Sequence, residues 1–213
     1  HPIRLVNRMI CLLVLALIVV PTSLVARVPQ GFTVRDRSTK ALSFTYVPVI
    51  RSWDTVVAID GSTVRPVIDG AQIRASADGK TIQWTVSVDV IVPGPDGFRL
   101  DRNDLRTFTL GSSLPFTVEQ RDADARIRAP RPLTERVTVA YDGIARDRHI
   151  ARVTIVVASR ENARTTITRN VDLELTFSGS GVGTARTPST LDVLNPQAPW
   201  QISRSVDRLV KGE

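Results

Sequence analysis

The residue types best suited to nucleophilic or acid–base chemistry are scarce in this chain of 213 residues. It contains two histidines, His1 and His149, and a single cysteine, Cys11. A Ser-His-Asp arrangement would therefore have to use His149, which follows Asp147 and Arg148 and stands just before an apolar stretch. That position is typical of a junction between a loop and a strand, and it predicts an exposed imidazole without a catalytic role.

Metal and phosphate motifs are incomplete. Asp101 and Asn103 alternate as at the start of a calcium loop, but Leu105 takes the third ligand position and the loop's glycine and glutamate are absent. The glycine-rich segment 179–183 follows a predicted strand, but no helix pattern comes after it to receive a phosphate. We therefore expect no metal, no cofactor and no catalytic residues, and we predict that the protein is not an enzyme.

Apolar and polar residues alternate along much of the chain. Segment 81–90 has the clearest alternation, which places Gln83 and Thr85 on a solvent-facing side. An apolar face opposite a polar face predicts strands of antiparallel sheets. Similar patterns occupy segments 42–50, 136–141 and 170–177, and segment 150–158 is apolar on both faces at its end.

Asp-Gly pairs separate many of these segments. Both residues tolerate the positive φ of tight turns, so the pairs that begin at Asp60, Asp69, Asp78, Asp96 and Asp142 predict turns. About ten short strands predict a mainly β fold, an antiparallel β-sandwich (Ig-like or jelly-roll-like) over residues 31–180. The charged segment 121–136 is a candidate domain boundary, but few strands follow it, so we expect one domain with a long loop.

An apolar run begins at residue 9 and, extended to Ala26, has 18 residues, just enough to cross a bilayer. It is either a cleaved secretion signal or a retained helix. Leu24 is a poor −3 residue for cleavage after Ala26, so we predict a transmembrane helix, or signal anchor, over residues 9–27 behind a basic tail over residues 1–8. The predicted anchor residues are Met9, Leu12, Leu13, Leu15, Leu17, Ile18, Val19 and Val20.

Arg4 and Arg8 precede the apolar run without an acidic residue between them. Basic residues mark the cytoplasmic end of a membrane helix. We therefore expect a single-pass protein of a bacterial cell membrane, with its N-terminus in the cytoplasm and its β-domain periplasmic or extracellular.

Residues 181–213 form a predicted tail rich in Gly, Ser and Pro that ends in a short amphipathic helix. That helix is expected to dock on its own domain, on another subunit or on the membrane surface. Two tryptophans, one in a predicted loop and one in the tail, complete the candidates for partner contact. These candidates are Trp53, Trp200, Ile202, Val206, Leu209 and Val210.

The formal net charge is +7, but acidic residues lie among the arginines and aromatic residues make up only 5% of the chain, so nucleic acid is not an expected partner. We predict a membrane-anchored, non-catalytic accessory or scaffold subunit of a cell-envelope complex. Its partners would be the lipid bilayer and other protein subunits. Two alternatives stay open: a subunit of a filament or pilus-like appendage with the N-terminal helix in the filament core, and a carbohydrate-binding or adhesive surface module.

Overall fold

The structure is a computed structural model of residues 1–213, and it describes residues 30–58, 61–77, 80–110, 130–161, 164–178 and 192–200. The predicted membrane anchor over residues 9–27 and the four apolar residues of the predicted C-terminal helix lie outside these ranges. Within them, no helix has the length and apolar character needed to cross a membrane.

All regular elements of the described chain are strands, which confirms the prediction of a mainly β, antiparallel structure. The strands are β1 (Phe32–Arg37), β2 (Ala41–Tyr46), β3 (Ile50–Ala58), β4 (Gly61–Ile68), β5 (Gln72–Ala75), β6 (Thr81–Val92), β7 (Phe98–Leu110), β8 (Val137–Ala145), β9 (Arg148–Glu161) and β10 (Arg164–Phe177).

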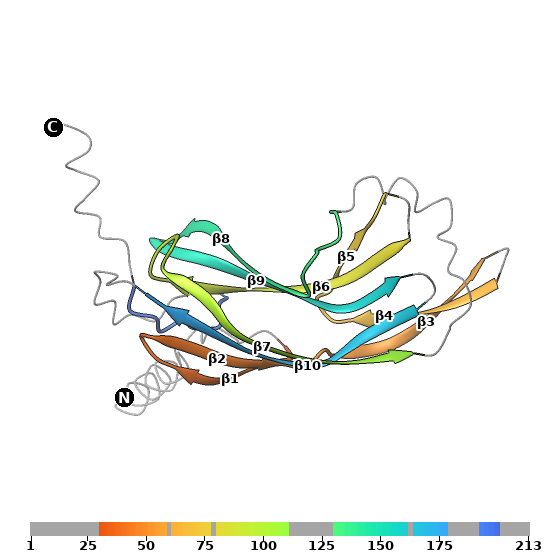
Figure 1. Ribbon diagram of the computed structural model, residues 1–213, viewed down its shortest axis with the longest axis horizontal. Coiled ribbons are helices and arrows are strands. Elements are labelled where there is room, and N and C mark those ends of the chain that lie inside the picture. Colours follow the sequence, from red (N-terminus) through yellow and green to blue (C-terminus); the bar gives the residue numbers. More distant parts are fainter. Residues whose placement is uncertain are drawn as a thin grey trace, which may run out of the picture.

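Eight of these strands belong to one sheet, which folds over into two layers (Figure 1). The first layer has the order β1-β2-β10-β7 and the second has the order β5-β6-β9-β8. The layers are joined where the end of β9 pairs with the start of β10, from Arg164 opposite Glu161 to Ile167 opposite Ala158. The long strands β9 and β10 are therefore central strands of the two layers and connect them.

The core lies between the two layers. Val171, Leu173 and Leu175 of β10 are at most 2% exposed, while Asp172 and Glu174 between them are half-buried, as the alternation predicts. Their partners in the same cluster include Val88 of β6 and Ile155 of β9. Burial of such side chains supplies the main driving force for folding.

The prediction that Gln83 and Thr85 of segment 81–90 face solvent is wrong. Gln83 and Thr85 are 6% and 1% exposed. The amide of Gln83 donates to Leu133 O and its carbonyl accepts from Leu133 N, at 3.0 and 2.8 Å. Thr85 donates to Gln72 O of β5. Backbone of neighbouring segments therefore covers this end of β6. The two side chains form hydrogen bonds with the polar groups of that backbone.

Segment 42–50 is two strands and not one. β2 ends at Tyr46 and β3 begins at Ile50, because Pro48 between them has no N–H to donate to a neighbouring strand. Among the strands that the structure describes, β3 pairs with β4 alone, in a two-stranded hairpin separate from the main sheet. The hairpin is attached at its base, where Ile68 is 7% exposed and Ile50 packs against the core.

One predicted turn is a β-bulge. Asp69-Gly70 does separate β4 from β5, but Gly143 lies inside β8, where the register with β9 shifts and φ is +117°. The β8–β9 turn falls instead at Arg146 and Asp147, whose φ values are +48° and +62°. Arginine rarely adopts positive φ, so the sequence contains no turn signal at this point.

The C-terminal segment (residues 192–200) lies along β6 as part of the domain. Val193 forms a parallel bridge with Asp89, and Leu194 N donates to Asp89 O at 3.1 Å. Asn195 accepts from Ile91 N and donates to Ile91 O, both at 2.8 Å. β5 covers β6 only as far as Thr85, and the C-terminal segment supplies hydrogen-bond partners farther along the same edge, at Asp89 and Ile91.

Candidate interaction surface

The β3–β4 hairpin carries an exposed aromatic side chain. Trp53 is 42% exposed and lies opposite Pro66. The next pair, Asp54 and Arg65, forms an ion pair with a distance of 3.7 Å between Arg65 Nε and Asp54 Oδ2. Because neighbouring side chains of a strand point to opposite faces, Trp53 and this ion pair lie on opposite faces of the hairpin.

We define the hairpin surface as the exposed side chains among residues 51–55 of β3, which are Arg51, Ser52, Trp53 and Thr55. Arg51 pairs with Asp69 at the hairpin's base, with Nη2 and Oδ2 2.7 Å apart. An isolated two-stranded hairpin is only marginally stable in water. A partner that covered Trp53 would therefore bury apolar area and also stabilise the hairpin.

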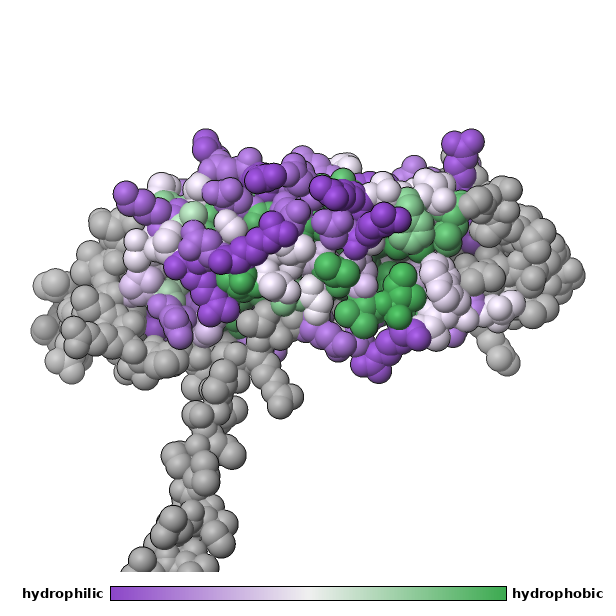
Figure 2. All heavy atoms as spheres, turned by 90° about the horizontal axis from the view of Figure 1, so that it is seen from below, coloured by the Kyte–Doolittle hydropathy of each residue, from purple (hydrophilic) through white to green (hydrophobic). Residues whose placement is uncertain are grey.

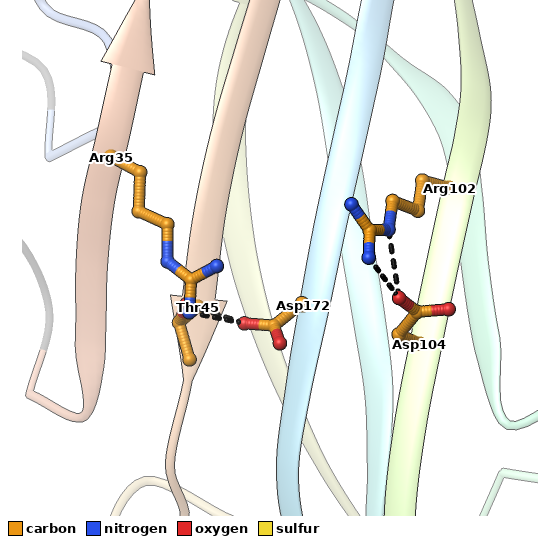
Figure 3. A network of polar contacts seen from close by, with 5 residues as sticks. All are labelled: Arg35, Thr45, Arg102, Asp104 and Asp172. Carbon is orange, nitrogen blue, oxygen red and sulfur yellow. Dashed lines mark hydrogen bonds and ion pairs between the residues drawn. The ribbon is translucent and has the colours of Figure 1, made fainter.

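The outer face of the first layer is covered by paired charges (Figure 3). Asp172 of β10 lies directly opposite Asp104 of β7, a like-charge pair that would be destabilising by itself. Arg35 neutralises Asp172 at 2.8 Å, and Thr45 also donates to Asp172. Arg102 neutralises Asp104, with Nε 2.7 Å from Oδ2. Figure 2 shows hydrophilic side chains over much of the described surface on this side.

The second layer has a similar group of charges. Arg152 of β9 lies between Asp89 of β6 and Asp142 of β8, at 2.9 and 2.7 Å. The hydrogen bond to Asp89 raises the pKa of Arg152. Ion pairs this exposed contribute little stability each, about 0–1 kcal/mol. Their effect is to neutralise Asp172, Asp104, Asp89 and Asp142 on the outer faces of the two layers.

The segment that resembles a calcium loop is part of a strand. Asp101 and Asn103 lie within β7, where the backbone is extended and paired with β10, so the loop geometry is absent. Across the described residues, no group of three His, Cys, Asp or Glu side chains could hold a metal ion.

Asp101 instead accepts hydrogen bonds that favour its charged form. The hydroxyl of Thr176 is the main reason that the pKa of Asp101 is lowered, and Arg99 adds to the effect. A lowered pKa stabilises the fold above the pKa of the unfolded state, and this contribution is lost as pH falls through the folded-state pKa. We expect Thr176→Val and Arg99→Gln each to raise the pKa of Asp101, as measured by NMR titration of its carboxyl carbon. An unchanged pKa in the Thr176→Val variant would contradict this assignment.

His149 is not the exposed imidazole that its position predicts. It lies within β9, is half-buried, and its Nδ1 is 2.7 Å from the hydroxyl of Tyr141 on β8. The prediction failed because β9 already begins at Arg148, so His149 is a strand residue and not part of a loop. The Tyr141 ring packs beside the imidazole and covers part of it.

The two tryptophans proposed for partner contact lie in different environments. Trp53 is exposed on the hairpin, whereas Trp200 is 5% exposed and packs edge-on against Phe177, with ring centroids 4.7 Å apart. Trp200 belongs to a second apolar cluster with Ile91, Ile150, Val193 and Ala198. The remaining proposed contacts, Ile202, Val206, Leu209 and Val210, lie outside the described residues, as do the anchor residues from Met9 to Val20.

The buried Arg148 is a residue that sequence reasoning did not single out. It is 5% exposed, burial lowers its pKa, and its Nη1 donates to Ala198 O and Trp200 O at 2.6 and 2.7 Å. Asn195 was missed in the same way. A buried arginine and an asparagine next to proline carry no sequence signal of these bonds, because their partners lie about 50 and 104 residues away.

No family model and no curated protein matches the sequence. The fold is similar to that of a chain in the complex of the pro- and mature domains of RgpB from Porphyromonas gingivalis. That similarity has a TM-score of 0.53 at 10% identity and covers 72% of this chain and 87% of that chain. A structure concerned with the zymogenic latency of gingipain K from the same organism matches with a TM-score of 0.48 at 19% identity, covering 76% and 97%. At 10% identity, the similarity to the first of these structures is one of fold.

Proposed function

We propose that this chain is a non-catalytic β-sandwich domain that acts through contacts with other proteins. The observation that carries the proposal is the β3–β4 hairpin, a two-stranded arm outside the main sheet with Trp53 exposed on one face. Exposed tryptophans are the residues most enriched among the few that dominate binding energy at interfaces. The ion pairs on the two outer faces support the same view, because an arginine neutralises each of the aspartates Asp172, Asp104 and Asp89.

The wider setting is also a proposal. We propose that the apolar run over residues 9–27 anchors the domain in a cell membrane, with the N-terminus in the cytoplasm and the β-domain outside it. The domain would then be an accessory or scaffold subunit of an envelope complex. The length of the run and the arginines before it support this arrangement. A filament subunit would polymerise, and a carbohydrate-binding module would retain binding to glycans after removal of the apolar run.

A second candidate function is supported by the likeness in fold to a chain of the pro- and mature-domain complex. In this candidate, the chain is a pro-domain that binds a mature domain. The two candidates differ in the partner that they require. A pro-domain should co-purify in one-to-one ratio with a partner from the same precursor, as peptide mapping would show, whereas an envelope subunit should co-purify with unlike proteins in a fixed ratio.

The test of the interaction proposal compares two exposed apolar side chains. Trp53→Ala should weaken the purified complex by about 2 kcal/mol or more, or about thirtyfold in Kd. Ile144→Ala is the matched control, because Ile144 is 63% exposed on β8. Sedimentation of complexes made with each variant measures the difference. Equal affinities of the Trp53→Ala and Ile144→Ala variants would overturn the assignment of the hairpin surface.

A further inference from the structure

A polar pocket opens where the two layers meet, at the end of the β9–β10 hairpin. Its volume is about 470 Å³. Ser159 and Glu161 end β9, and Arg164 and Thr166 begin β10. Ser159 lies directly opposite Thr166, and Glu161 lies opposite Arg164. Since alternate residues of a strand share a face, these four side chains all point to the same side.

Arg136 forms the remaining wall of this pocket. Its carbonyl accepts from Val156 N at 2.8 Å, which fixes the backbone beside β9, and its Nη2 donates to Ser159 Oγ at 3.3 Å. Nη1 of the same guanidinium is fully covered and has no hydrogen-bond partner in the described part of the chain. A buried donor without an acceptor is destabilising, and native structures rarely retain one without a reason.

The charges around the pocket favour an anion. Two arginines face one carboxylate, Glu161, and no ion pair joins either Arg136 or Arg164 to a carboxylate within the ranges that the structure describes. Elsewhere on the domain, arginines such as Arg35, Arg102 and Arg152 have aspartate partners. The pocket thus collects guanidinium and hydroxyl donors without enough acceptors from the protein itself.

We propose that this pocket, the Arg136 pocket, binds an oxyanion, either a carboxylate or a phosphate group. A planar guanidinium can donate two parallel hydrogen bonds to either group, and the hydroxyls of Ser159 and Thr166 can donate to a remaining oxygen. The anion would supply an acceptor to the Arg136 guanidinium, which lines the pocket and lacks one at Nη1. This inference stands independently of the proposed interaction through Trp53.

The experiment titrates the whole chain, with its arginine side chains labelled with ¹⁵N, at constant ionic strength. The two probes are inorganic phosphate and a blocked diglutamyl peptide. We expect saturable shifts of the Arg136 side-chain resonances with a Kd tighter than about 1 mM. Arg136→Gln should weaken binding about tenfold or more, since hydrogen bonds to charged groups are the stronger ones. Arg164→Gln should weaken binding less, because Arg164 is exposed.

Arg106→Gln is the matched control, because Arg106 is an exposed arginine of β7 that does not line the pocket. It should leave both affinities unchanged. Tighter binding of phosphate would identify a phosphate group as the ligand, and tighter binding of the peptide would identify an acidic side chain. The proposal is overturned if neither probe saturates, or if the control weakens binding as much as Arg136→Gln. Arg164→Gln keeps the test decisive if Arg136→Gln does not fold.

Discussion

Trp200→Ala is expected to destabilise the domain by about 3–5 kcal/mol, the range for truncation of a buried aromatic side chain. The indole is 5% exposed and packs against Phe177 at the end of β10. Its removal would leave a cavity lined by the apolar cluster that includes Ile91 and Ile150. The substitution should also weaken the hydrogen bonds that Arg148 donates to the C-terminal segment, because the backbone carbonyl of Trp200 accepts one of them.

Urea denaturation of the purified domain measures this effect as a lower midpoint with an unchanged slope. Trp53→Ala is the matched control, because it removes the same side chain from a site that is 42% exposed. We expect the control to lose no more than about 1 kcal/mol. If Trp200→Ala cost as little as Trp53→Ala, the C-terminal segment would not be packed on the domain in solution.

The alternation of apolar residues predicted much of the described sheet. In β10 and over residues 86–90 of β6, the apolar side chains lie on the side that faces the core, because the alternation itself records which face is buried. The pattern failed where a polar residue is buried by neighbouring backbone. Gln83 is an example, because its amide satisfies the backbone of Leu133, which lies 50 residues away. Such bonds depend on tertiary structure, which periodicity does not encode.

Turns and edges were predicted less well for a related reason. An Asp-Gly pair permits positive φ, but Gly143 shows that the chain can use that freedom for a bulge inside a strand. The turn at Arg146 and Asp147 is imposed by the strands on either side, since arginine has no preference for it. Residue type indicates which conformations are allowed, while packing selects one of them.

Of the two candidate sites, one was named from the sequence and the other was found only in the structure. Trp53 was named as a candidate because it was predicted to lie in a loop, whereas the structure places it within strand β3, where it is 42% exposed. The Arg136 pocket could not be predicted, because its residues come from three separate segments, around 136, 159–161 and 164–166, and nothing in the sequence indicates that they meet. The pocket exists only once β9 and β10 have paired and Arg136 has been placed beside them.

Asn195→Ala is expected to cost about 2–4 kcal/mol, because it removes the partners of two buried backbone groups at once. The N–H and C=O of Ile91 both bond to the Asn195 amide at 2.8 Å, and Ile91 itself is 0% exposed. Both groups point away from β9, and β5 ends before it reaches them. Amide hydrogen exchange at Ile91 should accelerate in this variant, while exchange at Val86 should follow only the change in global stability.

Asn195→Asp provides a control whose effect depends on pH. A neutral carboxylic acid can replace both bonds, accepting from Ile91 N–H and donating to Ile91 C=O, whereas a carboxylate can only accept and would face the carbonyl oxygen. Burial and this repulsion raise the pKa of the introduced carboxyl in the folded state. Its stabilising form is therefore fully present below the unfolded-state pKa of about 4 and is lost as pH rises through the folded-state pKa. Relative to the unsubstituted protein, Asn195→Asp should be destabilised at pH 7 and recover near pH 4, while Asn195→Ala should show no such recovery; parallel behaviour of the two variants would mean that Asn195 does not bond to both groups of Ile91.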